Sequence, residues 1–96
     1  MSEKLPCVYI LASSRNGTLY TGVTSDLPKR LQQHRTGVVE GFTKKYHVHT
    51  LVYYERHETM YAAISREKQI KGGSRKKTLA LIEGTNPMWR DLSDEL

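Results

Sequence analysis

The stretch CVYILASSRNGTLYTGVT, residues 7–24, decides how this chain begins to fold. It contains two short runs rich in β-branched and aromatic residues, at 7–11 and 19–24, and such runs are typical of β-strands. Asn16-Gly17 lies between them and favours a tight hairpin turn, because both residues tolerate a positive φ. The stretch therefore predicts a β-hairpin.

The centre of the turn fixes which residues of the hairpin face each other. With Asn16 and Gly17 as the two central turn residues, Leu11 lies opposite Gly22 and Tyr9 lies opposite Thr24. Side chains alternate across a strand, so the pairing predicts two distinct faces. One face carries Tyr9, Leu11, Tyr20 and Gly22, and the other carries Val8, Ile10, Thr21 and Val23.

The rest of the chain predicts three helices, one more strand and a tail. Ser25 or Asp26 can cap a helix that ends near Arg35. The further segments are a loop at 38–46, a strand at 47–56, a helix at 59–71, a helix from Ser74 to Ile82 stopped by Gly84, and an irregular tail at 84–96. The order β-β-α-β-α-α predicts a single α+β domain over residues 1–96, with a three-stranded, mainly antiparallel sheet flanked by helices.

Size and composition narrow the class of protein. The chain has 96 residues, which is enough for one small domain. Its one cysteine, Cys7, cannot form an internal disulfide, and no apolar run reaches the length of a membrane span. The N-terminus lacks an apolar signal core, so we expect a cytoplasmic protein that does not associate with a membrane. The net charge of +5 favours a polyanionic partner such as nucleic acid.

Glu67 breaks the apolar pattern of its predicted helix. It lies four residues after Ala63 and three before Ile70, inside the stripe that should face the core. A carboxylate in such a position is unfavourable unless it is paired or binds a metal ion. The sequence leaves two alternatives: Glu67 pairs with a neighbour such as Lys71 in solvent, or it holds a metal.

Residues of the first helix and of the hairpin also allow two interpretations each. Arg30 is either a surface arginine or a phosphate ligand, since it borders the inward edge of its helix. His34, one turn later, is either a packed histidine or a functional one. Tyr9 and Tyr20 are either packing residues or site residues, and the neighbouring Gly22 indicates close approach by a ligand or another backbone.

A basic segment runs from Arg66 to Lys77. It contains six basic residues and one acid, Glu67, so it carries the same +5 charge as the whole chain. Such a segment is either a solvated helix face or a track for nucleic-acid phosphates. The candidate phosphate contacts are Lys68, Lys71, Arg75, Lys76 and Lys77.

Together these residues resemble the GIY-YIG nuclease superfamily, which is named for two tripeptides on adjacent strands. The tripeptides here are Cys7-Val8-Tyr9, followed by Ile10-Leu11, and Tyr20-Thr21-Gly22. The first lacks the glycine and isoleucine of the family pattern. The family's helical arginine, the histidine of some members and the later glutamate match Arg30, His34 and Glu67. The resemblance covers residues 6–83 and is closest to a small stand-alone bacterial branch of uncharacterised predicted endonucleases.

The resemblance implies a divalent-metal-dependent endonuclease in repair or recombination, and it favours DNA over RNA as the substrate. Glu67 would hold Mg²⁺ or Mn²⁺, Arg30 would stabilise phosphate charge, and Tyr9 would activate water once nearby cations favour its phenolate. Tyr20 would position the water or phosphate, and His34 would assist Tyr9 or hold a phosphate. Many family members also use an asparagine, for which the only candidate is Asn86, beyond the last helix.

Two further points stay open at the level of sequence. One alternative function is a non-catalytic nucleic-acid-binding domain that keeps the nuclease fold, and another is an accessory protein that binds an acidic partner. The oligomeric state is undetermined. So short a chain has no room for an appended recognition domain, so we expect little sequence specificity.

Overall fold

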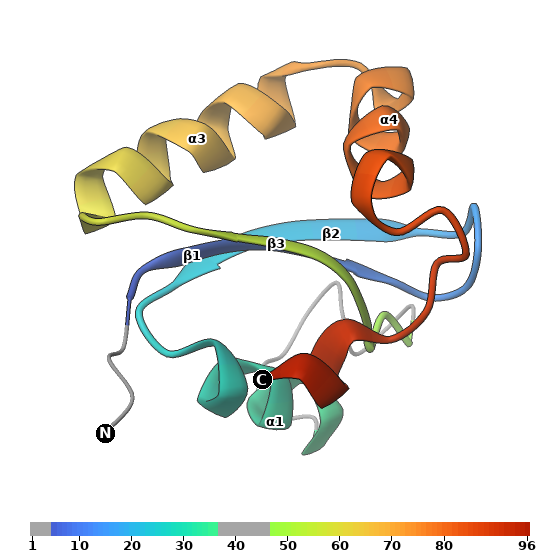
Figure 1. The fold of residues 1–96 in the computed structure, drawn as a ribbon, viewed down its shortest axis with the longest axis horizontal. Helices are drawn as coiled ribbons and strands as arrows, with labels where there is room; N and C mark the ends of the chain where they lie inside the picture. The colour runs from blue at the N-terminus through green and yellow to red at the C-terminus, as the bar shows by residue number, and fades with distance from the viewer. Residues whose placement is uncertain (1–4, 37–46) are drawn as a thin grey trace.

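The computed structural model describes residues 5–36 and 47–96, and the predicted α+β fold is confirmed. The sheet has three antiparallel strands in the order β2-β1-β3, so β2 is an edge strand. Helices α3 and α4 cover one face, and α1 lies on the other (Figure 1). The elements are β1 (Cys7–Ala12), β2 (Leu19–Thr24), α1 (Leu27–Thr36), β3 (Thr50–Arg56), α3 (Met60–Gly72), α4 (Arg75–Thr85) and the 3₁₀ helix η1 (Leu92–Glu95).

The hairpin register differs from the predicted one by two residues. Tyr9 lies opposite Gly22, and the last pair before the turn is Ala12 with Leu19. The connection is therefore the longer loop 13–18, in which Asn16 has φ 58° and two backbone hydrogen bonds close the turn. A shift of two residues preserves the alternation of side chains, so the predicted faces of the hairpin are still correct.

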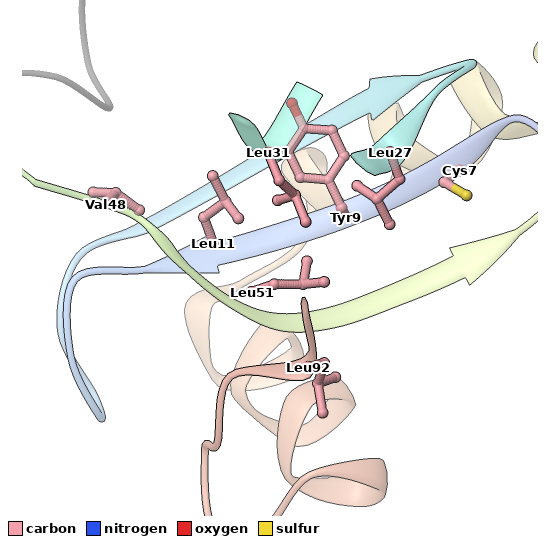
Figure 2. Packing of buried hydrophobic residues seen from close by; sticks show 8 residues of the cluster. All are labelled: Cys7, Tyr9, Leu11, Leu27, Leu31, Val48, Leu51 and Leu92. Carbon is pink, nitrogen blue, oxygen red and sulfur yellow. The ribbon is translucent and has the colours of Figure 1, made fainter. Parts of the chain in front are cut away.

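Each face of the sheet has its own part of the core. Ile10 and Ala12 pack under α4, and Val8 packs with Ala63 and Ile70 of α3. The cluster on the α1 side is shown in Figure 2 and consists of Cys7, Tyr9, Leu11, Leu27, Leu31, Val48, Leu51 and Leu92. Tyr9 is therefore held between the sheet and α1.

Three segments differ in the structure from their predicted extent or role. The third strand begins at Thr50 rather than at residue 47, and the loop expected at 38–46 lies outside the described residues. Helix α4, capped by Ser74 as predicted, continues past Gly84 to Thr85, because glycine lowers helix stability without preventing a helix. The segment after it is not only a tail, since the side chain of Leu92 enters the core.

No helix among the described residues is long and apolar enough to cross a membrane.

Candidate active site

Gly22 makes room for Tyr9 at the edge of the sheet. A Cβ atom at residue 22 would lie 2.6 Å from both Cζ and the hydroxyl oxygen of Tyr9, and 3.0 Å from Cε2 of Tyr20. The sequence indicated that a ligand or another backbone approaches this glycine, whereas the structure places the Tyr9 ring there. With only 1% of its surface exposed, Tyr9 has its hydroxyl fixed over β2.

His34 meets Tyr9 from α1. Leu27, Leu31 and His34 recur at turn spacing on the buried side of this helix, so the imidazole points toward the sheet. The Tyr9 hydroxyl and His34 Nε2 are 3.0 Å apart and form a buried hydrogen bond. The Tyr20 ring completes the group, with its centroid 6.2 Å from that of Tyr9 and 5.4 Å from that of His34.

Burial favours the neutral form of both members of this pair. Burial is the largest cause that raises the pKa of Tyr9, and Tyr20 and Glu67 add to it, while Arg30 opposes it. The pKa of His34 is lowered, chiefly by burial and then by Arg30 and His49. The condition that nearby cations favour a Tyr9 phenolate is not met among the described residues, because desolvation outweighs Arg30, the cation that favours it.

Arg30 lies close enough to act electrostatically on Tyr9 and on His34. Its Nε atom is buried and has no hydrogen-bond partner among the described residues. A buried donor without an acceptor is unfavourable. Arg30 thus presents an unused hydrogen-bond donor beside the Tyr9–His34 pair, and an anionic oxygen bound there could accept its hydrogen bond.

Glu67 lies on α3, and the pairing with Lys71 that the sequence offered as one alternative is present. Its carboxylate pairs with Lys71 Nζ at 3.2 Å, yet only 16% of its side chain is exposed. Lys71 in turn lies 5.9 Å from the centroid of the Tyr20 ring. Lys71 thus joins Glu67 of α3 to Tyr20 of the hairpin at the β2 edge. A surface groove there is lined by Leu19, Tyr20, Thr21 and Lys71.

His49 was not among the expected catalytic residues, but it also contributes to this environment. It precedes β3, acts electrostatically on His34, and its Nδ1 atom is buried without a hydrogen-bond partner among the described residues. Only the pairing of β3 with β1 brings it near α1. No local signal in the sequence places it there.

The predicted phosphate contacts do not form one uniform surface. Lys68, Lys76 and Lys77 are exposed on α3 and α4. Arg75 instead donates from Nη2 to the carbonyl oxygens of Asn16 and Gly17, at 2.9 and 2.8 Å, and so holds the hairpin loop. Of the predicted basic residues, Lys71 is the one that contacts the proposed catalytic group.

Asn86 is not brought to the tyrosines. It is 2% exposed, and its amide nitrogen donates to the carbonyl oxygens of Val52 at 3.1 Å and Arg90 at 2.9 Å. Its side-chain oxygen accepts the backbone N–H of Arg90 at 3.1 Å. These bonds give Asn86 a structural task, which is to fix the turn that follows α4.

Known proteins resemble this chain over most of its length. Residues 5–80 match the family model of the GIY-YIG catalytic domain. Proteins named UPF0213 from Staphylococcus aureus strains Mu3 and N315 are each 41% identical over 76 residues, which cover 79% of this chain and 92% of theirs. A UPF0213 protein of Bacillus halodurans, whose structure was determined by NMR in solution, has a TM-score of 0.56 and 27% identity, with 90% of each chain covered.

Proposed function

Because this chain belongs to the GIY-YIG catalytic domain family, we propose that it is an endonuclease that hydrolyses phosphodiester bonds of DNA. The observation that carries the proposal is the buried hydrogen bond between Tyr9 and His34, with Arg30 and Glu67 close enough to act on Tyr9. These four side chains come from a strand and two helices, and their convergence combines a proton-transfer pair, a cation and a carboxylate.

The neutral state of the pair supports a proton relay rather than a preformed phenolate. In the tautomer that leaves Nε2 unprotonated, His34 accepts the hydroxyl proton of Tyr9 while Tyr9 takes a proton from the attacking water. The resulting hydroxide forms the new bond to phosphorus, and the bond to the leaving sugar oxygen breaks. That oxygen then takes a proton from solvent, and the imidazolium of His34 returns one proton to solvent through Tyr9, which restores the starting state of the pair.

Arg30 and Lys71 supply positive charge for the phosphate. Arg30 Nε is a buried donor with no acceptor in the described chain, so a phosphate oxygen would satisfy it. Lys71 lies between Glu67 and the Tyr20 ring, at the mouth of the site. Charges fixed in a water-poor site stabilise a developing negative charge more strongly than they would in water.

Glu67 is the residue proposed to hold a divalent metal ion, Mg²⁺ or Mn²⁺. No group of three or more His, Cys, Asp or Glu side chains capable of binding a metal occurs in the described ranges. A single, largely buried carboxylate still fits Mg²⁺, which keeps several water ligands and binds protein through one or two carboxylates plus substrate phosphate. When bound, such an ion polarises the phosphoryl oxygen and stabilises the leaving oxygen.

We propose little sequence specificity and a substrate recognised through its backbone and shape. The exposed lysines Lys68, Lys76 and Lys77 are suited to phosphate contacts, and none of them presents a rigid hydrogen-bond fork for bases. DNA in repair or recombination is the substrate class and setting that the family likeness supports.

A nicking assay tests the function. Plasmid, single-stranded and branched DNA, with single-stranded RNA beside them, are incubated with the protein in Mg²⁺, in Mn²⁺ and in chelator. Glu67→Gln, which removes the charge at constant size, and Tyr9→Phe, which removes the hydroxyl, are run in parallel. We expect metal-dependent cleavage of DNA that falls by at least about 10²-fold in each variant.

Two outcomes would contradict the proposal. If the native protein cuts no faster than Glu67→Gln, it is not a nuclease of this type. Salt-dependent DNA binding without cutting would then favour the alternative, a non-catalytic nucleic-acid-binding domain.

A further inference from the structure

A second cavity lies away from the tyrosines, between α3 and α4. Its volume is about 410 Å³, within the range of about 300–1,000 Å³ typical of small-molecule sites. Figure 1 shows the two helices side by side on the sheet face opposite α1, whereas Tyr9 packs on the α1 side. The residues that line it are Arg66, Gln69, Ile70, Gly73, Lys77, Thr78, Ala80 and Leu81.

The lining combines apolar walls with positive charge. Ile70 and Leu81 belong to the cluster that packs over Val8, so the apolar side of the cavity continues into the core. The charged side chains that line it, among the described residues, are Arg66 and Lys77, and no carboxylate does. A ligand with one flat apolar part and one anionic part would contact both the apolar and the basic side chains of the cavity.

Arg66 is held in place before any ligand arrives. Its Nε atom donates to Glu55 at 3.0 Å, and its Nη1 atom donates to the side-chain oxygen of Gln69 at 2.7 Å. The pairing with Glu55 offsets much of its charge, which leaves Lys77 as the stronger attraction for an anion. Because the arginine is already ordered, binding to it loses less side-chain entropy.

Gly73 keeps the cavity open, although its backbone does not require glycine. Its φ is −87°, which any residue adopts. A Cβ atom there would meet its nearest neighbour, the carbonyl oxygen of Ile70, at an ordinary 3.5 Å. A side chain at residue 73 is therefore tolerated sterically, and its absence leaves space that a ligand can occupy.

We propose that this cavity binds one nucleotide unit, with the base against Ile70 and Leu81 and the phosphate at Lys77 and Arg66. The choice of a nucleotide among amphipathic anions rests on the proposed function, in which the protein handles nucleic acid. The unit is either a free nucleoside monophosphate or one nucleotide of a bound strand.

Amide shifts in the ¹⁵N NMR spectrum of the full chain, recorded in chelator, test the proposal. AMP, adenosine, inorganic phosphate and a short DNA oligonucleotide are titrated separately. We expect AMP to shift the amides of Gly73, Ala80 and Leu81 in a saturable way with Kd of about 1 mM or tighter, and adenosine or phosphate to bind at least about tenfold more weakly. Saturation by the oligonucleotide alone identifies the strand as the source of the nucleotide.

Matched variants decide whether the shifts report the cavity. Gly73→Trp fills it and should abolish the shifts, whereas Gly72→Trp adds the same bulk where a Cβ would meet nothing within 4 Å and should retain them. Lys77→Glu should weaken binding at least about tenfold, and Lys29→Glu, which is exposed on α1 outside the cavity, by less than about twofold. The lysine pair keeps the test decisive if Gly73→Trp does not fold.

The proposal is overturned if neither AMP nor the oligonucleotide gives saturable shifts at these amides, or if Gly73→Trp folds and retains them. It is equally overturned if Lys29→Glu weakens binding as much as Lys77→Glu. Glu67→Gln separates the two proposals, since it should remove cleavage and leave the cavity shifts unchanged. Cavity binding by a protein that cuts no DNA would refute only the nuclease function.

Discussion

Gly22→Ala should damage both the stability and the proposed active site through a single methyl group. The added Cβ would lie 2.6 Å from Cζ and from the hydroxyl oxygen of Tyr9. Ordinary carbon contacts are about 3.5–4.0 Å, so the ring has to retreat by roughly 1 Å. Tyr9 is 1% exposed and packs against α1, so its ring has no free space into which to move.

The size of the effect follows from two losses. Overpacking of a core costs about 1–3 kcal/mol of unfolding free energy. Displacing the Tyr9 hydroxyl by roughly 1 Å also stretches its 3.0 Å hydrogen bond to His34 beyond bonding length, which removes about 1 kcal/mol more. We therefore expect a loss of about 2–4 kcal/mol and, if the protein is a nuclease, a cleavage rate about 10²-fold lower.

Urea denaturation and the nicking assay measure these two effects. Gly84→Ala is the matched control, because a Cβ there meets nothing within 4 Å in a helix, and it should stabilise the chain by about 0.5–1 kcal/mol. Tyr9→Ala removes the ring, so the double variant Gly22→Ala/Tyr9→Ala should lose less stability than the sum of the single variants. An unchanged urea midpoint together with an unchanged cleavage rate in Gly22→Ala would refute the reasoning.

Three other predictions concern stability and loop order. Asn86→Ala should lower the unfolding free energy by about 2–4 kcal/mol, since it leaves buried backbone groups unpaired; Trp89 fluorescence during urea denaturation checks this, and a loss below about 0.5 kcal/mol contradicts it. Arg75→Ala should speed hydrogen exchange in the loop 13–18, while Lys76→Ala should not; equal protection in both variants excludes the proposed role of Arg75. The pKa of His34 is lowered in the folded chain, so the unfolded chain binds the extra proton first, and stability should fall as the pH drops below about 6.5. His34→Gln should flatten this decline when the urea midpoint is measured against pH. An identical slope in the variant and the native protein would contradict the role of His34.

Several features of the fold and of the candidate site follow from the spacing of residues in the sequence. The faces of the hairpin follow from strand alternation, and they remain correct although the register moves by two residues. The buried side of α1 follows from the spacing of Leu27, Leu31 and His34. The position of Glu67 in an apolar stripe indicated a special carboxylate before any contact was known. Each of these inferences uses only the period of one element.

The tertiary structure decided everything that depends on contacts between elements. It placed His34 on the Tyr9 hydroxyl, joined Glu67 to Lys71 beside Tyr20, and assigned Asn86 to the core. The cavity between α3 and α4 likewise depends on how two helices pack. Burial also opposes the phenolate form of Tyr9, because desolvation is set by the whole surroundings of a group. The sequence alone determined the elements, their inward faces and the residue types available for chemistry, since these depend on short-range geometry. Distances and burial depend on packing between segments far apart in the chain, and only the folded structure specifies them.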